Sequence, residues 1–580
     1  MTPRRILPVI LTVLLIVAAA LWWTFGEGTR QPFMVASANP YASDAAIEIL
    51  KEGGSAADAA VAVQAVLTLV EPESSGLAGG AFMLHWTPGG RKLDAYDGRE
   101  TAPAGATPDM FLDDKKAPLG IKDAVLSGRS VGVPGVVAML WLAHQEHGRL
   151  PWKRLFEPAI HLAEQGFRVS PKLAQSIARD PALASMPVAQ DYFFTTDAGG
   201  KRVPLAEGAL LKNPRLAETL KVIADKGPDG FYSGPVAQEI VDTVDHAPAL
   251  PGTLSLADLA GYKARHRDPI CRPYRDYRVC TMPPPTSGGL TTLQILGILE
   301  NFDMGQIAPM SLVAVHFIAE AEKLAYADRA KFIGDPDFVN VPVIPMLDAT
   351  YLRGRASLID PSLSMGHAAP GTVADKRADG YGLNVDISRP CTSHFSIIDA
   401  DGGVVSMTTS VEAPFGSHLM AGGMILNNQL TDFSFVPEQD GKPVANAVAP
   451  GKRPMSAMDP VIVFDDKGNF FAAVGSPGGS RIIGYVTETL IALLDWHMPM
   501  QEAIALPRFV DRNGPLEIEK GTSLEKLTPE LEQLKHEVKP VELRSGLHGI
   551  RQTAQGLDGG ADPRRDGTVA TGHVTSWFFF

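Results

Sequence analysis

The chain has 580 residues, enough for a large core and for more than one domain. Hydrophobic residues make up 45% and charged residues 20% of it, which is ordinary for a globular protein. The formal net charge of -13 argues against a nucleic-acid partner, because neutralising phosphates requires a basic face. The 56 glycines and 46 prolines are scattered along the chain, which favours a loop-rich enzyme over a coiled coil.

The N-terminal segment (1–30) predicts export. Arg4 and Arg5 precede an uncharged apolar run over residues 6–25, long enough for a helix to cross a bilayer. The stretch "VAAAL" also resembles a signal-peptidase site, so a cleaved signal peptide and a retained membrane anchor both stay open. With either, we expect the remaining chain in the periplasm or at the outer face of the cytoplasmic membrane.

Capping residues and periodicity predict two consecutive helices after this segment. Ser43 is expected to cap the first helix, which a glycine pair ends. Ser55 is expected to cap the second, with Asp58 in capping-box position. This second helix is apolar nearly all round over residues 59–70, so we expect it to be buried.

Strand-like and helix-like segments alternate further along the chain. "GGAFMLHW" alternates like a strand, and "TLQILGILENF" and "VHFIAEAEKLAYADRAKFI" read as amphipathic helices. "GGSRIIGYVTETLIALLDWHM" reads as another helix, entered through a glycine-rich turn. Strands interleaved with buried helices indicate a layered α/β architecture.

Two of the three cysteines flank a predicted hairpin. Cys271 and Cys280 lie on either side of "RPYRDYRV", which is expected to turn in its middle. In an exported protein they could form a disulfide across the hairpin, and two free buried thiols are the alternative. Cys391 is left without a partner.

Cys391 opens the stretch "CTSHFS", in which three thiol or hydroxyl residues precede a histidine. The following segment, 392–412, reads as two strands around the turn-rich sequence "DADGG". With a three-residue loop, Thr392 is opposite Ser410, and a two-residue loop shifts the pairing by one. Glu412 would then share the face of Ser410. The pattern suggests a catalytic site, but it is also typical of a polar strand start.

A threonine nucleophile requires a base to accept its proton. The sequence shows no Asp–His pair suited to a Ser–His–Asp triad, no "GxSxG" elbow, no metal motif and no phosphate-binding lysine loop. The remaining solution is an N-terminal threonine whose own α-amine, with a pKa near neutrality, takes the proton from its hydroxyl. That solution requires cleavage of the Cys391–Thr392 bond.

A series of motifs resembles the gamma-glutamyltransferase (gamma-glutamyl transpeptidase) family of N-terminal-nucleophile hydrolases. In order they are "MVASANPYASDAAIEILKEGGSAADAAVA", "PPPTSGGL", "TSHFS", "LNNQLTDFS", "GKRPMSAM", "GSPGGSRI" and "DPRRDG". The resemblance implies a four-layer αββα sandwich and autocatalytic cleavage before Thr392. It also implies that the large chain (31–391) and the small chain (392–580) stay associated as a heterodimer.

The resemblance assigns the catalytic residues. Thr392 is the matched nucleophile, and Ser410 matches a position whose hydroxyl contacts it. Gly478 and Gly479 match the oxyanion hole, which agrees with their place before a helix expected to begin near Ser480.

The resemblance also assigns the substrate-binding residues. Arg99 matches the arginine that binds the α-carboxylate of a γ-glutamyl group, assisted by Ser456. Gln429 and Asp432 match the pocket for its α-ammonium group. Glu412 stands where asparagine is common, as an additional carboxylate on that side.

The implied activity is hydrolysis of glutathione and transfer of γ-glutamyl groups to water, amino acids or peptides. It proceeds through a γ-glutamyl ester on Thr392 and requires no metal or organic cofactor. Two departures from the family pattern are Ala457, where a second serine is expected, and a short loop over 433–449 that lacks a tyrosine. They keep open a cephalosporin-acylase-like amidase that acts on glutaryl or related acyl groups. A non-catalytic binding protein that kept the fold is the third alternative, and it would remain an uncleaved chain.

Overall fold

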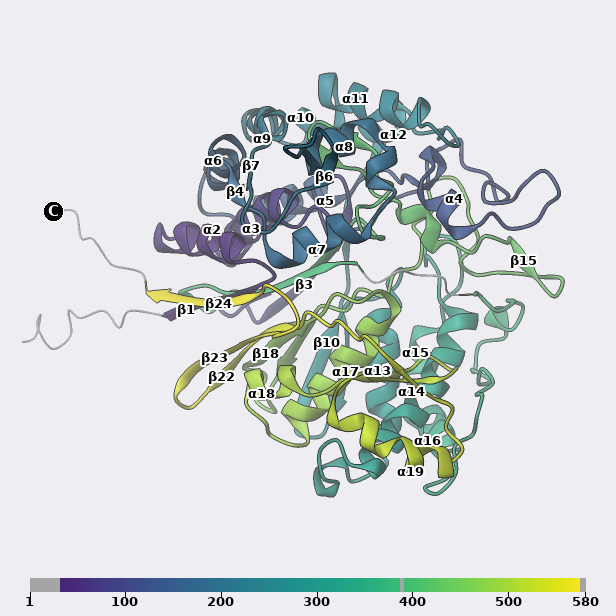
Figure 1. The fold of residues 1–580 in the computed structure, drawn as a ribbon. Helices are drawn as coiled ribbons and strands as arrows, with labels where there is room; N and C mark the ends of the chain where they lie inside the picture. Colours follow the sequence, from purple (N-terminus) through teal and green to yellow (C-terminus); the bar gives the residue numbers. More distant parts are fainter. Residues whose placement is uncertain (1–31, 386–390, 574–580) are drawn as a thin grey trace, which may run out of the picture.

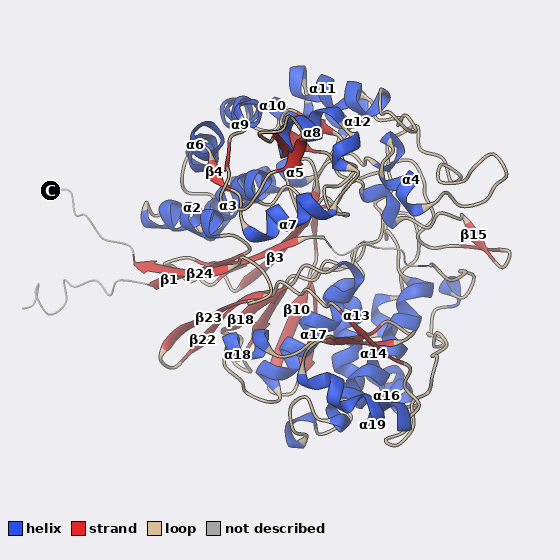
Figure 2. Ribbon diagram, in the orientation of Figure 1, coloured by secondary structure: helices blue, strands red, loops and turns tan. Residues whose placement is uncertain are grey.

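Two β-sheets pack face to face between two layers of helices (Figure 1). The computed structural model describes residues 32–385 and 391–573. The four-layer αββα sandwich expected from the sequence is confirmed, and Figure 2 shows the two sheets in red between blue helices. The predicted signal peptide or anchor at 1–30 lies outside the described residues. Within the described part of the chain, no helix is long and apolar enough to cross a membrane.

The first sheet is antiparallel throughout and carries the segment around Thr392. Its strands lie in the order β24 (Thr568–His573), β1 (Pro32–Ser37), β11 (Ser393–Ile398), β12 (Val404–Ser410), β2 (Gly80–Thr87), β3 (Lys92–Gly98) and β8 (Arg265–Arg267). Strand β11 is buried along its whole length, because helices cover one face of the sheet and the second sheet covers the other.

The hairpin of β11 and β12 has the register predicted for a three-residue loop. Ile398 pairs with Val404 and Ser393 pairs with Thr409. The same register places Thr392, the residue before β11, level with Ser410 at the end of β12.

The second sheet is also antiparallel. Its strands lie in the order β23 (Gly556–Ala561), β22 (His548–Thr553), β18 (Phe470–Gly475), β17 (Val461–Phe464), β10 (Tyr277–Thr281) and β9 (Ile270–Tyr274). Strands β9 and β10 form the hairpin predicted around "RPYRDYRV". Cys271 and Cys280 face each other across it and form a disulfide, and Cys391 is free and buried.

Helices cover the outer face of the seven-stranded sheet, in the upper half of Figure 1. In this half lie α2 (Pro40–Lys51), α3 (Ala56–Val70), α4 (Ile121–Val125), α5 (Val136–His147), α6 (Glu157–Gln165), α7 (Pro171–Arg179), α8 (Pro187–Phe193), α9 (Pro214–Lys226), α10 (Asp229–Tyr232), α11 (Gly234–Asp245) and α12 (Leu256–Gly261). Every residue of α3 is buried, as its apolar sequence predicted, and Ser55 and Asp58 form the predicted capping box.

The predicted cap of the first helix is wrong. Helix α2 begins earlier, at Pro40, and Asn39 is its N-cap, with a side chain that accepts the N–H of Tyr41. Proline at the first helical position favours this start, because its fixed φ suits a helix and its missing N–H is not needed there. Ser43 lies inside the helix instead, and its hydroxyl contacts those of Ser37 and Thr568 at 2.8 and 3.0 Å.

Helices of the lower half cover the six-stranded sheet. They are α13 (Gly288–Leu299), α14 (Leu312–Phe332), α15 (Val343–Met346), α16 (Ala349–Ala356), α17 (Ile482–Leu494), α18 (Met500–Ala505) and α19 (Thr528–Gln533). The three helices predicted in this region correspond to α13, α14 and α17. Short strands complete the fold: β4 (Phe167–Arg168), β5 (Phe194–Thr196), β6 (Arg202–Pro204), β7 (Leu210–Leu211), β13 (Met420–Ala421), β14 (Met424–Ile425), β15 (Glu438–Gln439), β16 (Lys442–Pro443), β19 (Phe509–Asp511), β20 (Leu516–Glu519) and β21 (Val538–Val541).

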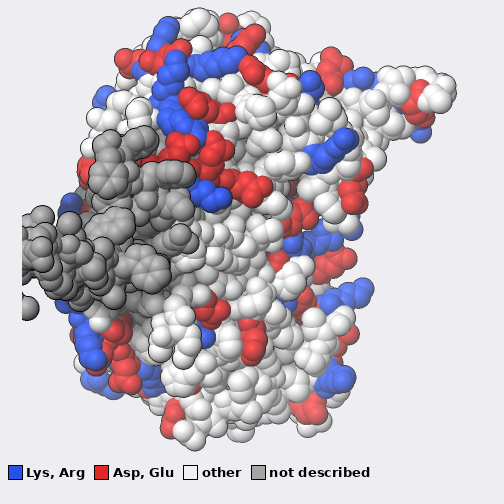
Figure 3. Space-filling model, turned by 90° about the vertical axis from the view of Figure 1, so that its left-hand side faces the viewer, with Lys and Arg blue, Asp and Glu red and all other residues white. Residues whose placement is uncertain are grey.

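Both sheets combine strands from before and after the 391–392 bond. In the first sheet, β1 lies between β24 and β11, and β12 pairs with β2. In the second sheet, β10 pairs with β17. The segments on either side of the bond therefore share their sheets and cores, and they do not form separate domains. On the face shown in Figure 3, basic and acidic side chains are interspersed over the surface.

Candidate active site

Thr392 lies at the entrance of β11, beside the end of β12. Thr392 is buried, with 3% of its surface exposed. The hydroxyl of Ser410 donates a hydrogen bond to the carbonyl oxygen of Cys391 at 2.8 Å. Arg565 donates from Nη1 to the carbonyl oxygen of Thr392 at 3.2 Å. Two donors therefore hold the chain at the bond predicted to be cleaved. One binds the carbonyl oxygen of Cys391 and the other binds the carbonyl oxygen of Thr392.

The Ser410 contact predicts a role in cleavage of the 391–392 bond. A donor on the carbonyl oxygen of Cys391 stabilises the negative charge that develops there when a nucleophile attacks. Ser410→Ala is expected to slow conversion of the precursor by about 100-fold, and Ser410→Thr is expected to restore it. The measurement is a time course of precursor and products on a denaturing gel. Ser406→Ala is the matched control on the same strand, and equal rates in Ser406→Ala and Ser410→Ala would contradict this role.

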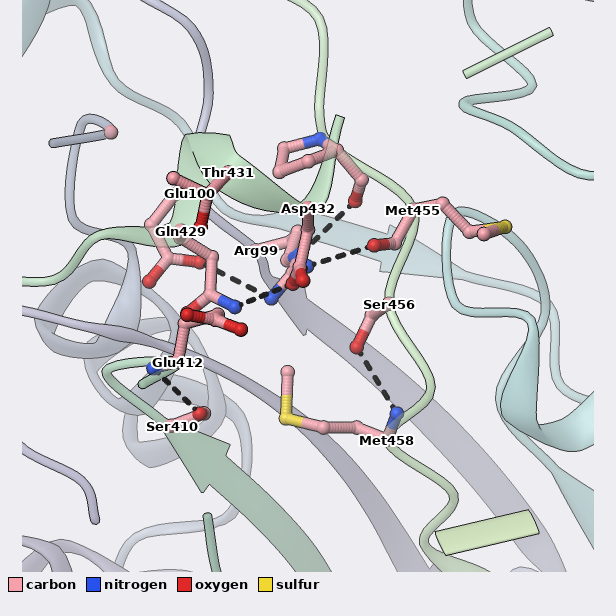
Figure 4. A network of polar contacts seen from close by, with 12 residues as sticks. Arg99, Glu100, Ser410, Glu412, Gln429, Thr431, Asp432, Met455, Ser456 and Met458 are labelled. Carbon is pink, nitrogen blue, oxygen red and sulfur yellow. Dashed lines mark hydrogen bonds and ion pairs between the residues drawn. The ribbon is translucent and has the colours of Figure 1, made fainter. Parts of the chain in front are cut away.

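One small cavity brings together all of the predicted site residues except Gly478. The cavity has a volume of about 20 Å³ and is lined by Arg99, Cys391, Thr392, Ser410, Glu412, Gln429, Asp432, Ser456, Ala457, Met458, Gly479 and Ile482. These residues come from both sides of the 391–392 bond and from both halves of the sandwich. Figure 4 shows the polar network around this cavity.

Arg99 is fully buried and held by three acceptors in the described residues. Its Nη2 donates to Asp432 Oδ2 at 2.6 Å and to the carbonyl oxygen of Met455 at 3.0 Å (Figure 4). Its Nε donates to the carbonyl oxygen of Pro454 at 3.1 Å. Nη1 forms no hydrogen bond within the described residues, although it lies 3.7 Å from Glu100 Oε2. The side chains predicted to bind the carboxylate and the ammonium group therefore pair with each other, and Nη1 of Arg99 has no hydrogen-bond acceptor among the described residues.

Glu100 is a site residue that the sequence did not reveal. Its side chain is fully buried beside Arg99, and burial raises its pKa to about 8. The carboxyl group is therefore mostly protonated at neutral pH, and Asp432 remains the principal counterion of Arg99. The sequence shows only an adjacent arginine and glutamate in "DGRE", a pattern that gives no signal of burial.

The side chains predicted to bind the α-ammonium group are Asp432, Gln429 and Glu412, and all three line the cavity. Gln429 donates from Nε2 to Asp432 Oδ2 at 2.8 Å, within the short 3₁₀ turn Gln429–Asp432. Its Oε1 is buried and accepts no hydrogen bond within the described residues. Glu412 accepts a hydrogen bond from Asn428 Nδ2, and it lines the cavity after β12 has ended. Because Glu412 has φ of 82°, the strand alternation used to place it does not apply, yet it lies beside Ser410.

The two glycines predicted as an oxyanion hole lie in a tight turn before α17. Gly478 has φ of 146° and Gly479 has φ of 59°, and a Cβ on Gly478 would lie 2.8 Å from the Tyr485 ring. A 3₁₀ turn (Gly479–Arg481) leads into α17, in agreement with a helix beginning near Ser480. Gly479 lines the cavity and Gly478 lies outside its lining, so one of the two predicted glycines contributes to the cavity wall.

Ser456 and Ala457 form a wall of the cavity and follow directly after Pro454 and Met455, whose carbonyl oxygens hold Arg99. The Ser456 hydroxyl oxygen accepts the backbone N–H of Met458 at 3.1 Å (Figure 4). Ala457 also lines the cavity, where the family pattern has a second hydroxyl. This wall therefore has one side-chain hydroxyl for a bound carboxylate where two are expected.

The sequence did not predict a charged network that lies behind the 391–392 bond. Ser393 donates its hydroxyl to Glu71 Oε2 at 2.8 Å, and Lys172 donates to Glu71 Oε1 at 3.0 Å and to the Ser74 hydroxyl at 2.9 Å. Residues 71–76, "EPESSG", follow the buried helix α3. Carboxylates and serines grouped at the end of a buried helix are the sequence pattern that could have predicted this network. No local signal marks Lys172, which comes from α7.

Cys391 and His394 are unsuited to be the nucleophile and its base. Burial raises the pKa of the Cys391 thiol to about 11, and its Sγ donates to the carbonyl oxygen of Glu73 at 2.7 Å. His394 is fully buried between the sheets, which lowers its pKa well below the usual value. Its two ring nitrogens contact Thr408 and Ser396 hydroxyls at 2.9 and 3.2 Å. These contacts are those of a residue that orients its neighbours in the sheet. The Ser393 hydroxyl donates to Glu71, so Thr392 stays the predicted nucleophile.

The αββα sandwich, with a buried threonine at the entrance of a central strand, defines an N-terminal-nucleophile hydrolase fold. The family model described as gamma-glutamyltranspeptidase matches residues 42–572. The chain therefore belongs to the gamma-glutamyltranspeptidase family.

Relatives of two kinds share this family membership. The glutathione hydrolase proenzyme of Escherichia coli (strain K12) is 38% identical over 560 residues, which cover 93% of this chain and 92% of the relative. The acylase ACY 1 proenzyme of Pseudomonas sp. (strain SE83) is 35% identical over 551 residues, with 92% of each protein covered. The crystal structure of cephalosporin acylase from Bacillus halodurans aligns with a TM-score of 0.79 at 28% identity, covering 93% of this chain and 96% of that one.

Proposed function

We propose that this protein is an exported γ-glutamyltransferase and glutathione hydrolase. In the first step, the Thr392 hydroxyl attacks the γ-amide carbonyl of a γ-glutamyl compound and forms an ester, and an amine such as cysteinylglycine leaves. In the second step, water or the amino group of an amino acid or peptide accepts the γ-glutamyl group. The free α-amine of Thr392 takes the hydroxyl proton and returns it to the leaving amine.

The observation that carries this proposal is an unpartnered donor and acceptor in the same cavity. Arg99 Nη1 and Gln429 Oε1 are both buried and form no hydrogen bond within the described residues. Unmade hydrogen bonds of buried groups are unfavourable, so a ligand that satisfies both gains affinity. The α-carboxylate of a γ-glutamyl group satisfies the guanidinium, and its α-ammonium group satisfies the amide oxygen together with Asp432 and Glu412. Because Arg99 and Gln429 share this cavity with Thr392, a γ-glutamyl group bound in this way would have its γ-carbonyl next to the proposed nucleophile.

Maturation is proposed to couple cleavage with opening of the site. Attack of the Thr392 hydroxyl on the Cys391 carbonyl carbon shifts the acyl group from nitrogen to oxygen. Water then hydrolyses this ester, leaving a carboxylate on Cys391 and a free amine on Thr392. Cys391 lines the 20 Å³ cavity and also a neighbouring cavity of about 980 Å³, so its departure from Thr392 would join the two. The large chain (31–391) and small chain (392–580) would remain a heterodimer through their shared sheets.

An acylase acting on glutaryl or related acyl groups is the second candidate. It is favoured by Ala457, which removes one hydroxyl from the carboxylate side of the cavity, and by the acylase relatives. The short segment 433–449, which contains the β15–β16 hairpin, would admit larger acyl groups than a longer lid. The chemistry at Thr392 is the same for both candidates, and they differ in whether the acyl group carries an α-ammonium.

Export is proposed from the N-terminal sequence and the disulfide. Arg4 and Arg5 before the apolar run at 6–25 fit a signal peptide or an anchor whose arginines stay inside. A disulfide between Cys271 and Cys280 fits an oxidising compartment such as the periplasm.

The proposed function is tested with the purified wild-type protein. Two chains are expected on a denaturing gel, and N-terminal sequencing of the smaller chain is expected to begin at Thr392. The processed protein is expected to release p-nitroaniline from γ-glutamyl-p-nitroanilide and to transfer the γ-glutamyl group to glycylglycine. A small chain that begins elsewhere, or a processed protein inactive on glutathione and γ-glutamyl-p-nitroanilide, would overturn the proposal.

A further inference from the structure

The large cavity beside the 391–392 bond carries an excess of positive charge, and the proposed reaction gives that charge no role. The cavity has a volume of about 980 Å³, and Cys391 lines both it and the small cavity of the predicted γ-glutamyl site. Eight Lys or Arg residues line the large cavity against five Asp or Glu residues, although the whole chain has a formal net charge of -13. Positive charge is therefore concentrated beside the proposed nucleophile of an acidic protein.

Three cations of this lining form no ion pair and no side-chain hydrogen bond within the described residues. They are exposed and come from separate parts of the chain: Lys122 of α4, Arg179 at the end of α7, and Lys520 directly after β20. Carboxylates of the same lining are already paired, since Glu519 contacts Arg564 and Glu542 contacts Arg544, both at 2.7 Å. The excess charge is thus available to an anion that enters from solvent.

One face of helix α7 connects the 391–392 bond with the outer part of this cavity. The residues of α7 that line it recur at helical spacing: Pro171, Lys172, Gln175, Ser176 and Arg179. Lys172 donates from Nζ to the Ser74 hydroxyl at 2.9 Å, and the Cys391 Sγ lies 3.6 Å from the same hydroxyl. The start of α7 therefore lies beside Cys391. Arg179 follows seven residues after Lys172, which is about 10 Å further along the helix axis.

This distance suits a short peptide on the amine side of the substrate. In the proposed reaction the γ-glutamyl group occupies the small cavity, so the amine that leaves or accepts it lies past Cys391, in the large cavity. An extended peptide spans about 3.3–3.6 Å per residue, so two or three residues cover about 7–10 Å. Their C-terminal carboxylate would then come within reach of the Arg179 side chain.

We infer that Arg179, supported by Lys520 and Lys122, selects leaving and accepting peptides of two or three residues that carry a free C-terminal carboxylate. A guanidinium group binds a carboxylate through two parallel hydrogen bonds, and unpaired cations around a cleft raise the local concentration of anions. The inference rests on the proposed function and names the residues that recognise the amine side of the substrate, which the γ-glutamyl site does not contact.

The test compares glutathione with its glycine ethyl ester, which differs only in that the C-terminal carboxylate is blocked. Both release glutamate on hydrolysis, so the processed full-length protein is assayed for glutamate release with each. The wild type is expected to prefer the free acid by at least about tenfold in kcat/KM. Arg179→Gln is expected to reduce this preference to about threefold or less by lowering kcat/KM for the acid and leaving that for the ester unchanged. The preference is also expected to decrease at high ionic strength, because exposed charges are screened by salt.

Arg353→Gln is the matched control, since Arg353 is an exposed helical arginine of α16 outside the cavity. It is expected to keep the wild-type preference, and Lys520→Gln is expected to reduce it. Equal turnover of acid and ester by the wild type would overturn the inference, as would an unchanged preference in both Arg179→Gln and Lys520→Gln. If the same protein hydrolyses γ-glutamyl-p-nitroanilide, the proposed function stands despite that failure. Inactivity on all three γ-glutamyl compounds would overturn the proposed function and the inference with it.

Discussion

Thr392→Ala is expected to remain a single uncleaved chain and to lose turnover by at least about a thousandfold. The substitution removes the hydroxyl proposed to attack both the Cys391 carbonyl and the substrate, and no other nucleophile in the cavity replaces it. The measurements are a denaturing gel of the purified protein and the rate of p-nitroaniline release. Normal cleavage in Thr392→Ala would exclude Thr392 as the nucleophile of maturation.

Two companion variants separate this role from general damage at the site. Thr392→Ser keeps a hydroxyl and is expected to cleave, although more slowly. Cys391→Ala is expected to cleave normally, because the buried thiol has a pKa of about 11 and is not the reacting group. Loss of cleavage in Cys391→Ala with retention in Thr392→Ala would reverse the assignment.

Features set by neighbouring residues could be predicted from the sequence. The turn-rich sequence "DADGG" limited the hairpin to two registers, because the register follows from the loop length, and the structure has the one for a three-residue loop, with Thr392 level with Ser410. The capping box of Ser55 and Asp58 likewise depends on residues three apart. Ser43 failed as a cap because two capping signals competed within a few residues, and proline at the first helical position favoured Asn39.

Features that depend on burial and on distant residues could not be predicted. Glu100 follows Arg99 directly, but only the folded structure shows that it is buried with a raised pKa. Lys172 and Glu71 meet behind Ser393 because α7 packs beside the end of α3, a contact between residues 101 positions apart. The sequence motifs predicted Arg99 and Asp432 in one site, but did not indicate that they form an ion pair with each other.

The pairing of Arg99 with Asp432 sharpens the choice between the two candidate substrates. A γ-glutamyl group brings a carboxylate for Nη1 of Arg99 and an ammonium for Asp432 and for Oε1 of Gln429. A glutaryl group brings only the carboxylate. It would satisfy Nη1 of Arg99 but would provide no donor for Gln429 Oε1, and an unmade hydrogen bond of a buried group is unfavourable. A site built to bind a polar group discriminates strongly against an analogue that lacks it.

We therefore expect the wild type to prefer γ-glutamyl-p-nitroanilide over glutaryl-p-nitroanilide by at least about tenfold in kcat/KM. Asp432→Asn is expected to narrow this ratio, because it removes a negative charge that attracts the α-ammonium group and leaves Nη1 of Arg99 in place for the carboxylate of either substrate. Asp440→Asn, the same change at an exposed position of the β15–β16 turn, is expected to keep the ratio. Steady-state kinetics with both substrates provide the measurement. If the wild type turns over the glutaryl substrate as fast or faster, the α-ammonium is not what the cavity recognises, and the acylase candidate replaces the γ-glutamyltransferase.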